Sequence, residues 1–216
     1  MSEISGFATT PSATDLATHI RQVAAQTLKQ KRRFLVGIVG APGAGKSTLA
    51  QKLAETLGEG AAVVPMDGYH LDNVILAARG LLEQKGAPQT FDADGFAHML
   101  ARLRQEQDVI YPLFDRALDL ARAGAGNVGA NDKIVLVEGN YLLLDQVAWR
   151  AMAVHFDMTL SLEVARGELE KRLIARWIDY GFSKADATFR ASRNDMVNVD
   201  LVQNQSRKAD IEVRQG

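Results

Sequence analysis

The feature that most constrains the fold is an apolar run followed at once by a glycine-rich turn. Residues 34–39 read Phe-Leu-Val-Gly-Ile-Val, which is typical of a strand buried on both faces of a parallel sheet. The run leads into residues 40–48, Gly-Ala-Pro-Gly-Ala-Gly-Lys-Ser-Thr, which fit the pattern Gly-x-x-x-x-Gly-Lys-Ser/Thr. A helical segment, 46–57, follows. A strand, a glycine turn and a helix in this order predict a phosphate-binding loop rather than a chance match.

The chemistry of a bound triphosphate needs these residue types. Glycines let the backbone curl, so that successive N–H groups point at phosphate oxygens. Lys46 supplies a positive charge to the β- and γ-phosphates, and the Ser47 hydroxyl can ligate Mg²⁺. We therefore expect a nucleoside triphosphate to bind here. The residues expected to contact it are Gly40, Gly43, Ala44, Gly45, Lys46, Ser47 and Thr48.

The composition is that of an ordinary globular protein and argues against several classes. Of the 216 residues, 47% are hydrophobic and 24% are charged, so a sizeable core can form. A formal net charge of −1 argues against a nucleic-acid coat or a membrane-surface protein, and the absence of cysteine excludes disulfides and thiolate nucleophiles. Neither a signal peptide nor the roughly 18-residue apolar stretch of a membrane span is visible. We expect a cytoplasmic protein that binds neither nucleic acid nor membrane.

Apolar runs alternate with segments of helical periodicity along the rest of the chain. Further buried strands are expected at 61–66, 133–137, 156–162 and 209–213, and helices at 14–29, 46–57, 93–104, 149–154, 164–180 and 183–196. Residues 108–114 look extended, and 122–132 are interpreted as a loop or an edge hairpin. The basic run Lys29–Arg33 is interpreted as a solvated helix end.

This alternation predicts an α/β fold, a three-layer sandwich around a five-stranded, mostly parallel sheet of the P-loop nucleoside triphosphate hydrolase type with a small lid. We expect residues 1–33 to form an N-terminal tail and helix. Residues 34–216 are expected to form a single domain, with the lid at about 172–195.

Two acidic residues stand where predicted strands end. Asp67 follows the second strand and Glu138 the third, and ligands of open parallel sheets bind beyond these ends. Glu138 has the Walker-B-like position of an acid that holds Mg²⁺ directly or through water. Asp67 is placed to accept the proton of an attacking hydroxyl, or to support the metal. The alternative for each is an N-cap or a surface carboxylate.

Other motifs narrow the class of nucleotide-binding protein. The chain has no Asn-Lys-x-Asp motif, and no Asp-x-x-Gly follows the third strand, which argues against a GTPase. A motor or assembly ATPase would be larger. These absences leave a small kinase whose helical excursions cover an acceptor pocket.

Several short blocks resemble one family of kinases. The blocks are Pro-Met-Asp-Gly-Tyr-His at 65–70, Thr-Phe-Asp at 90–92, Tyr-Pro-Leu-Phe-Asp-Arg at 111–116, Val-Glu-Gly-Asn-Tyr at 137–141 and Arg-Leu-Ile-Ala-Arg at 172–176. They resemble the uridine kinase, phosphoribulokinase and bacterial pantothenate kinase group of P-loop kinases. Within it, the chain is most similar to the branch described as fructose transport system kinases. The likeness runs from about residue 34 to about residue 213.

The resemblance implies roles for individual residues. It implies Asp67 as the catalytic base, Ser47 with Glu138 as the magnesium ligands, and ATP with Mg²⁺ as cofactors. It also implies that Arg172 and Arg176 neutralise charge on the transferring phosphoryl group as lid arginines, with a solvated helix face paired to glutamates as the alternative. The residues that it places around the acceptor are Tyr69, His70, Asp92, Phe114, Arg116 and Tyr141. For His70 and Tyr141, packing roles are the alternative.

The departures from the family pattern concern the acceptor. Uridine kinases carry a histidine five places after the aromatic at 114, where this chain has Asp119, and their lid motif is replaced by Trp-Ile-Asp-Tyr-Gly at 177–181. We therefore expect a kinase that phosphorylates a sugar or polyol hydroxyl. The alternatives are a nucleoside or pantothenate kinase and a nucleotide-binding regulator without catalysis. Residues 204–210 resemble the segment that approaches the adenine, with an ordinary loop as the alternative, and a homodimer is a further expectation.

Overall fold

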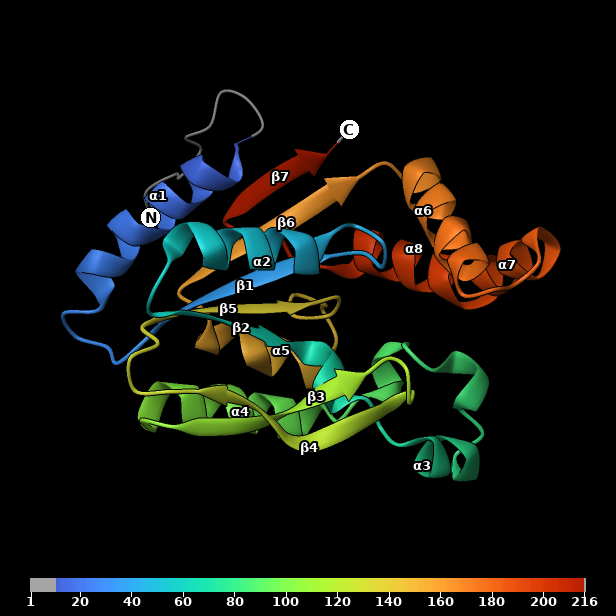
Figure 1. Ribbon diagram of the computed structural model, residues 1–216, viewed down its shortest axis with the longest axis horizontal. Helices are drawn as coiled ribbons and strands as arrows, with labels where there is room; N and C mark the ends of the chain where they lie inside the picture. Colours follow the sequence, from blue (N-terminus) through green and yellow to red (C-terminus); the bar gives the residue numbers. More distant parts are fainter. Residues whose placement is uncertain (1–10, 216) are drawn as a thin grey trace.

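A computed structural model describes residues 11–215, and they fold around one five-stranded parallel sheet (Figure 1). Its strand order is β2-β5-β1-β6-β7, and every neighbouring pair is parallel. The strands are β1 (Phe34–Gly40), β2 (Ala61–Pro65), β5 (Ile134–Gly139), β6 (Met158–Val164) and β7 (Ile211–Gln215). The predicted α/β fold with a five-stranded sheet is confirmed, and every pair in the sheet is parallel.

Helices α1 (Ala13–Thr27) and α2 (Lys46–Leu57) pack against each other beside the sheet (Figure 1). Helix α1 begins at a capping box, in which the Ser12 hydroxyl accepts from the Asp15 N–H and the Asp15 carboxylate accepts from the Ser12 N–H. Its apolar face belongs to the same hydrophobic core as the sheet. The division of the chain at residue 33 remains a prediction.

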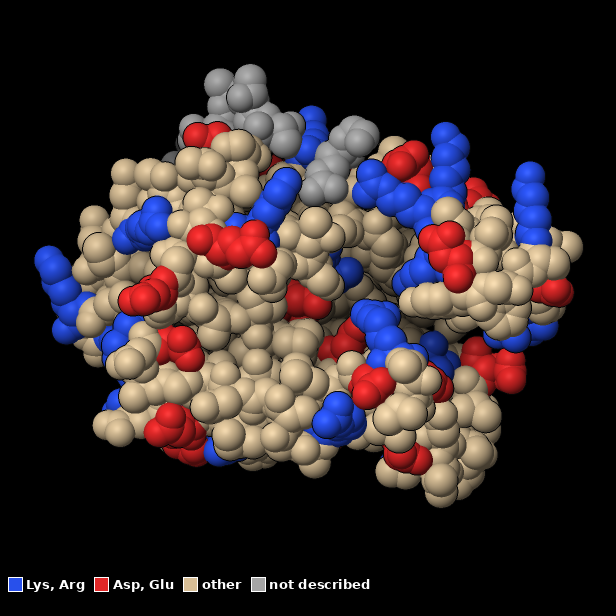
Figure 2. Space-filling model, in the orientation of Figure 1, with Lys and Arg blue, Asp and Glu red and all other residues tan. Residues whose placement is uncertain are grey.

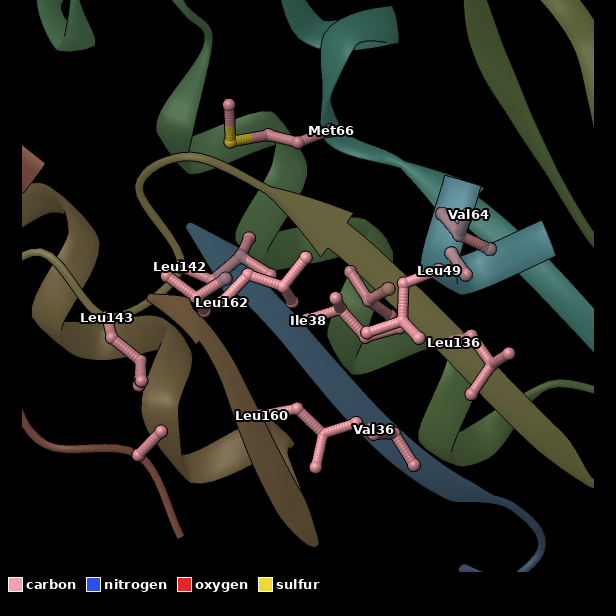
Figure 3. Close-up of a cluster of buried hydrophobic side chains, with 14 of the residues drawn as sticks. Val36, Ile38, Leu49, Val64, Met66, Leu136, Leu142, Leu143, Leu160 and Leu162 are labelled. Atoms are coloured by element: carbon pink, nitrogen blue, oxygen red, sulfur yellow. The ribbon is translucent and has the colours of Figure 1, made fainter. Parts of the chain in front are cut away.

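The strands around β1 carry the centre of that core. Figure 3 shows Val36 and Ile38 of β1 beside Leu160 of β6 and Leu136 of β5, with Leu49 of α2 next to them. All but Leu49 are fully buried. Such aliphatic packing from three adjacent strands and a helix fixes the ends of the strands, from which the site is built.

A long excursion connects β2 to β5, its neighbour in the sheet. It contains the short helices η1 (Met66–Tyr69), α3 (Asn73–Ala78), η2 (Leu82–Gln84) and η3 (Pro88–Thr90), then α4 (Ala93–Gln105) and the strands β3 (Val109–Asp115) and β4 (Leu120–Val128). Strands β3 and β4 pair antiparallel as a separate hairpin. The interpretation of 122–132 as part of a hairpin is correct for 122–128, but β4 begins earlier and the hairpin does not lie at an edge of the main sheet.

The region after β5 carries α5 (Val147–Arg150) and η4 (Ala151–His155), and the region predicted to contain the lid follows β6. It consists of α6 (Arg166–Asp179), α7 (Lys184–Arg190), a π-helical turn η5 (Ala191–Asp195) and α8 (Met196–Gln205). These helices form a lobe at the end of the sheet where β1 and β6 finish (Figure 1). The predicted second helix, 183–196, is wrong at its end, because helical structure continues through α8. The lid boundary at about 172–195 remains a prediction.

Arg33 corrects the interpretation of the basic run as solvent-exposed. Its side chain is 1% exposed and donates to five backbone carbonyls, those of Leu103, Glu106, Gln107, Gly129 and Asp132. Burial lowers the pKa of its guanidinium. Arg33 thus joins the end of α4 to the loop before β5.

Among residues 11–215, no helix has both the length and the apolar character needed to cross a bilayer.

Candidate active site

The phosphate loop between β1 and α2 has the conformation that its glycines predict. Gly43 and Gly45 have φ of 79° and 89°, a left-handed region that strongly favours glycine. Gly45 is the N-cap of α2, and no side chain of the described residues caps this helix. The first N–H groups of α2 are therefore available to an anion, whose charge the helix N-terminus favours.

Lys46 and Glu138 are both buried beside this loop. The Lys46 ammonium donates to the carbonyl oxygen of Ala41 at 3.1 Å, and burial lowers its pKa while Glu138 and Asp67 oppose that shift. Burial likewise raises the pKa of Glu138, against the effect of Lys46. A buried cation and a buried anion within electrostatic reach thus favour each other's charged form.

Ser47 and Glu138 meet as predicted for a magnesium site. The Ser47 hydroxyl donates to Glu138 Oε1 at 2.8 Å. Hydroxyl and carboxylate oxygens are the ligands that Mg²⁺ prefers, usually completed by water and phosphate oxygens. No group of three or more acidic, histidine or cysteine side chains suited to a metal lies within 11–215. The pair fits a cation that is held jointly with a nucleotide.

Asp67 follows β2 on the short helix η1. Its carboxylate accepts from the Arg116 guanidinium at 2.9 Å, and its side chain is 28% exposed. The next residue must be glycine, because a Cβ at Gly68 would lie 2.0 Å from the carbonyl oxygen of Pro112. This close approach of η1 to β3 fixes the position of Asp67 relative to Arg116, which follows β3.

One cavity of about 1430 Å³ joins these groups. Single ligand sites measure about 300–1,000 Å³, so this cavity has room for two ligands. Figure 2 shows a hollow between the body of the molecule and the lobe of α6–α8, with basic and acidic side chains at its rim. The predicted residues that line the cavity are Gly43, Gly45, Lys46, Ser47, Thr48, Asp67, His70, Phe114, Arg116, Glu138 and Arg176.

His70 and Phe114, two of the residues predicted to surround the acceptor, lie together at the cavity. Their ring centroids are 4.6 Å apart, and His70 also contacts Phe91 at 4.0 Å. Burial lowers the pKa of His70, which favours the neutral form of the ring. The His70 Nδ1 lies 2.8 Å from the Asp67 carbonyl oxygen. This ring stack supports η1 and leaves Phe114 facing the cavity.

Six of the predicted residues do not line the cavity, and two of them, Gly40 and Ala44, are buried in the phosphate loop. Tyr69 packs against the Phe96 ring, and the Tyr141 hydroxyl donates to the Gly86 carbonyl oxygen at 2.5 Å. Asp92 is exposed and caps α4 by accepting from the Gly95 N–H. Arg172 pairs with Glu168 one turn before it, at 2.9 Å, which was the alternative for the lid arginines. In this conformation, Tyr69, Asp92, Tyr141 and Arg172 have structural partners instead of a place at the cavity wall.

Sequence reasoning missed several residues that line the cavity. Lys85 donates to Asn73 Oδ1 and to the Asp119 carbonyl oxygen, each at 2.7 Å, and lies 5.2 Å from the Phe114 ring centroid. Asp119 has φ of 52° and also forms an ion pair with Lys85 at 2.9 Å. Asn73 and Lys85 stand in segments without a local motif, so no signal in the sequence pointed to them. Asp119 and the aromatic residues of 177–181 stood out in the sequence only as departures from the family pattern, and Asp195 belongs to no motif.

No family model matches the chain. Individual proteins do. A crystal structure from Silicibacter sp. TM1040, described as a "putative fructose transport system kinase", is 44% identical with a TM-score of 0.88, covering 94% of this chain and 98% of that one. "Uncharacterized protein YggC" of Escherichia coli (strain K12) is 38% identical over 87% of this chain and 80% of its own length. "Putative uridine kinase C227.14" of Schizosaccharomyces pombe is 31% identical over 89% and 87%.

The fold, the phosphate loop and the carboxylates at the strand ends define a P-loop small-molecule kinase, which transfers phosphate to an alcohol group. The chain belongs to the P-loop kinase family that includes uridine kinase-like proteins and pantothenate kinases. The predicted family and enzyme class are thereby confirmed.

Proposed function

We propose that this protein is a Mg-ATP-dependent kinase that phosphorylates a hydroxyl of a small sugar or polyol, such as a fructose-like molecule. The observation that carries the proposal is that Asp67 shares one cavity with the phosphate loop, Ser47 and Glu138. A kinase needs a base beside the acceptor hydroxyl and a charged cradle around the triphosphate, within reach of each other.

In this proposal, residues of the chain bind the triphosphate, orient the groups that react and neutralise charge. Ser47 and Glu138 would hold Mg²⁺, which neutralises phosphate charge when it is bound. Lys46 and the N–H groups of the loop bind the triphosphate oxygens. Asp67 accepts the proton of the acceptor hydroxyl, and Arg116, which donates to its carboxylate at 2.9 Å, orients it. Catalysis then rests mainly on positioning and electrostatics.

The acceptor side favours a polyhydroxylated ligand. Asn73, Arg116 and Asp119 bring polar side chains to the cavity beside the Phe114 ring. Such groups suit the hydroxyls and the apolar face of a sugar. The relative from Silicibacter sp. TM1040 is described as a fructose transport system kinase, which agrees with this choice.

Two other functions stay as alternatives. The acceptor could be a nucleoside or pantothenate, as the names of other relatives suggest. The chain could instead bind nucleotide as a regulator without transferring phosphate. A cytoplasmic location and a homodimer remain proposals, and light scattering of the purified protein tests the second.

Acceptor-dependent ADP release tests the proposal. Sugars, polyols, nucleosides and pantothenate are each offered with MgATP, and we expect a sugar or polyol to raise ADP release well above the ATP-only background. Asp67→Ala should abolish that increase, whereas Asp94→Ala, an exposed acid in the first turn of α4, should keep it. If no acceptor raises ADP release, the regulator function is favoured. Full activity of Asp67→Ala would disprove its role as base.

A further inference from the structure

The π-helical turn η5 joins α7 to α8 in the region that follows β6. π-Helical turns are rare and often occur at functional sites. Two consecutive residues of this turn, Asn194 and Asp195, line the cavity and form hydrogen bonds in different directions. Asp195 is 8% exposed, so its charge requires partners.

Asp195 holds the end of helix α6. Its Oδ1 accepts from the Arg176 guanidinium at 2.9 Å, and its Oδ2 accepts from the Trp177 indole N–H at 2.6 Å. Arg176 lies near enough to Lys46 to lower the pKa of that lysine. The carboxylate therefore fixes the lid arginine that faces the phosphate loop, and it does so through two consecutive residues of one helix.

Asn194 connects the same turn to the acceptor side. Its side-chain amide Nδ2 donates to the Lys85 backbone carbonyl oxygen at 2.8 Å, and its side-chain Oδ1 accepts from the Asn198 side-chain amide at 3.1 Å. The Lys85 ammonium, in turn, is bonded to Asn73 and Asp119 of the cavity wall. The hydrogen bonds of two consecutive residues of η5 thus connect the segment around Lys85, through Asn194, to Arg176, through Asp195.

We propose that Asp195 and Asn194 are positioning residues, which hold Arg176 at the phosphate site in a way that depends on the acceptor-side segment around Lys85. Asp195 acts through Arg176, and Asn194 links the position of η5 to the wall that an acceptor contacts. This inference rests on the proposed function, since it assumes that Arg176 stabilises the transferring phosphoryl group.

Kinetics of matched variants test the role of Asp195. Asp195→Asn keeps the shape but removes the charge, and we expect kcat to fall about 10- to 100-fold with little change in KM. Asp179→Asn removes an exposed charge from the end of α6, the helix that Asp195 contacts, and should leave kcat unchanged. In an Arg176→Ala background, Asp195→Asn should have no further effect, because both changes remove one interaction. The proposal fails if Asp195→Asn behaves like Asp179→Asn, or if the two losses multiply.

A second measurement needs no acceptor. The chain has two tryptophans, so Trp149→Phe leaves Trp177 as the only one. In this background Asp195→Asn should increase the quenching of Trp177 fluorescence by acrylamide, and Asp179→Asn should not. Equal quenching in both would show that Asp195 does not hold this end of α6. If no acceptor stimulates the wild type, the proposed function fails, while this measurement still decides whether Asp195 holds the lid.

Asn194→Ala tests the link to the acceptor side. We expect acceptor-stimulated ADP release to fall about 2- to 30-fold, and by a larger factor than ATP-only hydrolysis. Ser192→Ala, on an exposed residue of the same turn, is the control. An equal loss in both reactions, or no loss in either, would refute the coupling.

Discussion

Replacing Gly68 with alanine should disable the enzyme through a single methyl group. The Cβ of an alanine would lie 2.0 Å from the carbonyl oxygen of Pro112 and 2.6 Å from its carbonyl carbon. Observed Cβ contacts are essentially never shorter than 3.0 Å, so the two backbones must separate by about 1 Å. Neither is a flexible side-chain tip. Helix η1, which carries Asp67, therefore has to move away from β3.

The size of the effect follows from that displacement. Overpacking of this kind costs about 1–3 kcal/mol of unfolding free energy. For a chain of this length that corresponds to a melting temperature lower by about 2–12 °C. A shift of about 1 Å in a catalytic group lowers the rate about 100-fold, or ~2.7 kcal/mol in activation free energy. We expect both losses in Gly68→Ala.

Thermal unfolding and acceptor-dependent ADP release measure the two losses. Gly167→Ala is the matched control, because a Cβ there meets nothing within 4 Å and the position lies in the first turn of α6. It should unfold at the wild-type temperature or slightly above, as alanine favours helix over glycine. The reasoning is refuted if Gly68→Ala melts with the wild type and keeps its activity. A lower melting temperature with full activity would show that β3 yields and that Asp67 keeps its place.

Two further predictions concern buried charges. Arg33→Met should lower the unfolding free energy by about 3–5 kcal/mol, because buried carbonyl oxygens lose their donor. Denaturant titration measures this loss, and Arg32→Met, at an exposed position, is the control. Equal stability of the two variants would refute the prediction. Burial raises the pKa of Glu138 in the ligand-free protein. The folded state therefore binds a proton at Glu138 more readily than the unfolded chain does. The stability that this proton contributes is lost as the pH rises through the pKa of the folded state. A bound cation needs the carboxylate, so MgATP should raise the melting temperature more near neutral pH than at about pH 5. Glu138→Gln should abolish the difference, and a pH-independent shift in the wild type would contradict the assignment.

The fold was largely predictable because local patterns specify it. The strands of the sheet are short apolar runs, and a buried parallel strand needs only such a run. The carboxylates Asp67 and Glu138 were found because each directly follows an apolar run that predicts a strand. The end of α8 was missed because residues 197–205 mix polar and apolar positions without a strong periodicity.

Side-chain partners far apart in the sequence were not predictable. Arg33 stands in a run of charges that looks exposed, and only the folded chain brings the carbonyls of α4 around it. Arg172 and Arg176 are four residues apart and share a helix face, but Glu168 pairs with the first and Asp195 with the second. Lys85 lies at the cavity wall, where it donates to Asn73 and Asp119 from two other segments of the chain. Such contacts depend on tertiary geometry, which a motif does not encode.

The excursion between β2 and β5 has a consequence for how acceptor preference can change. The chain leaves the sheet at Pro65 and returns at Ile134, so the anchor points of 66–133 lie on neighbouring parallel strands but at opposite edges of the sheet. Lengthening a loop between fixed ends costs only about 0.6 kcal/mol for each doubling. The groups proposed to bind the triphosphate lie outside this stretch, whereas the proposed base Asp67 stands at its start. Under the proposed function, the part of the chain that binds the acceptor can therefore change in length and sequence while the donor site stays intact.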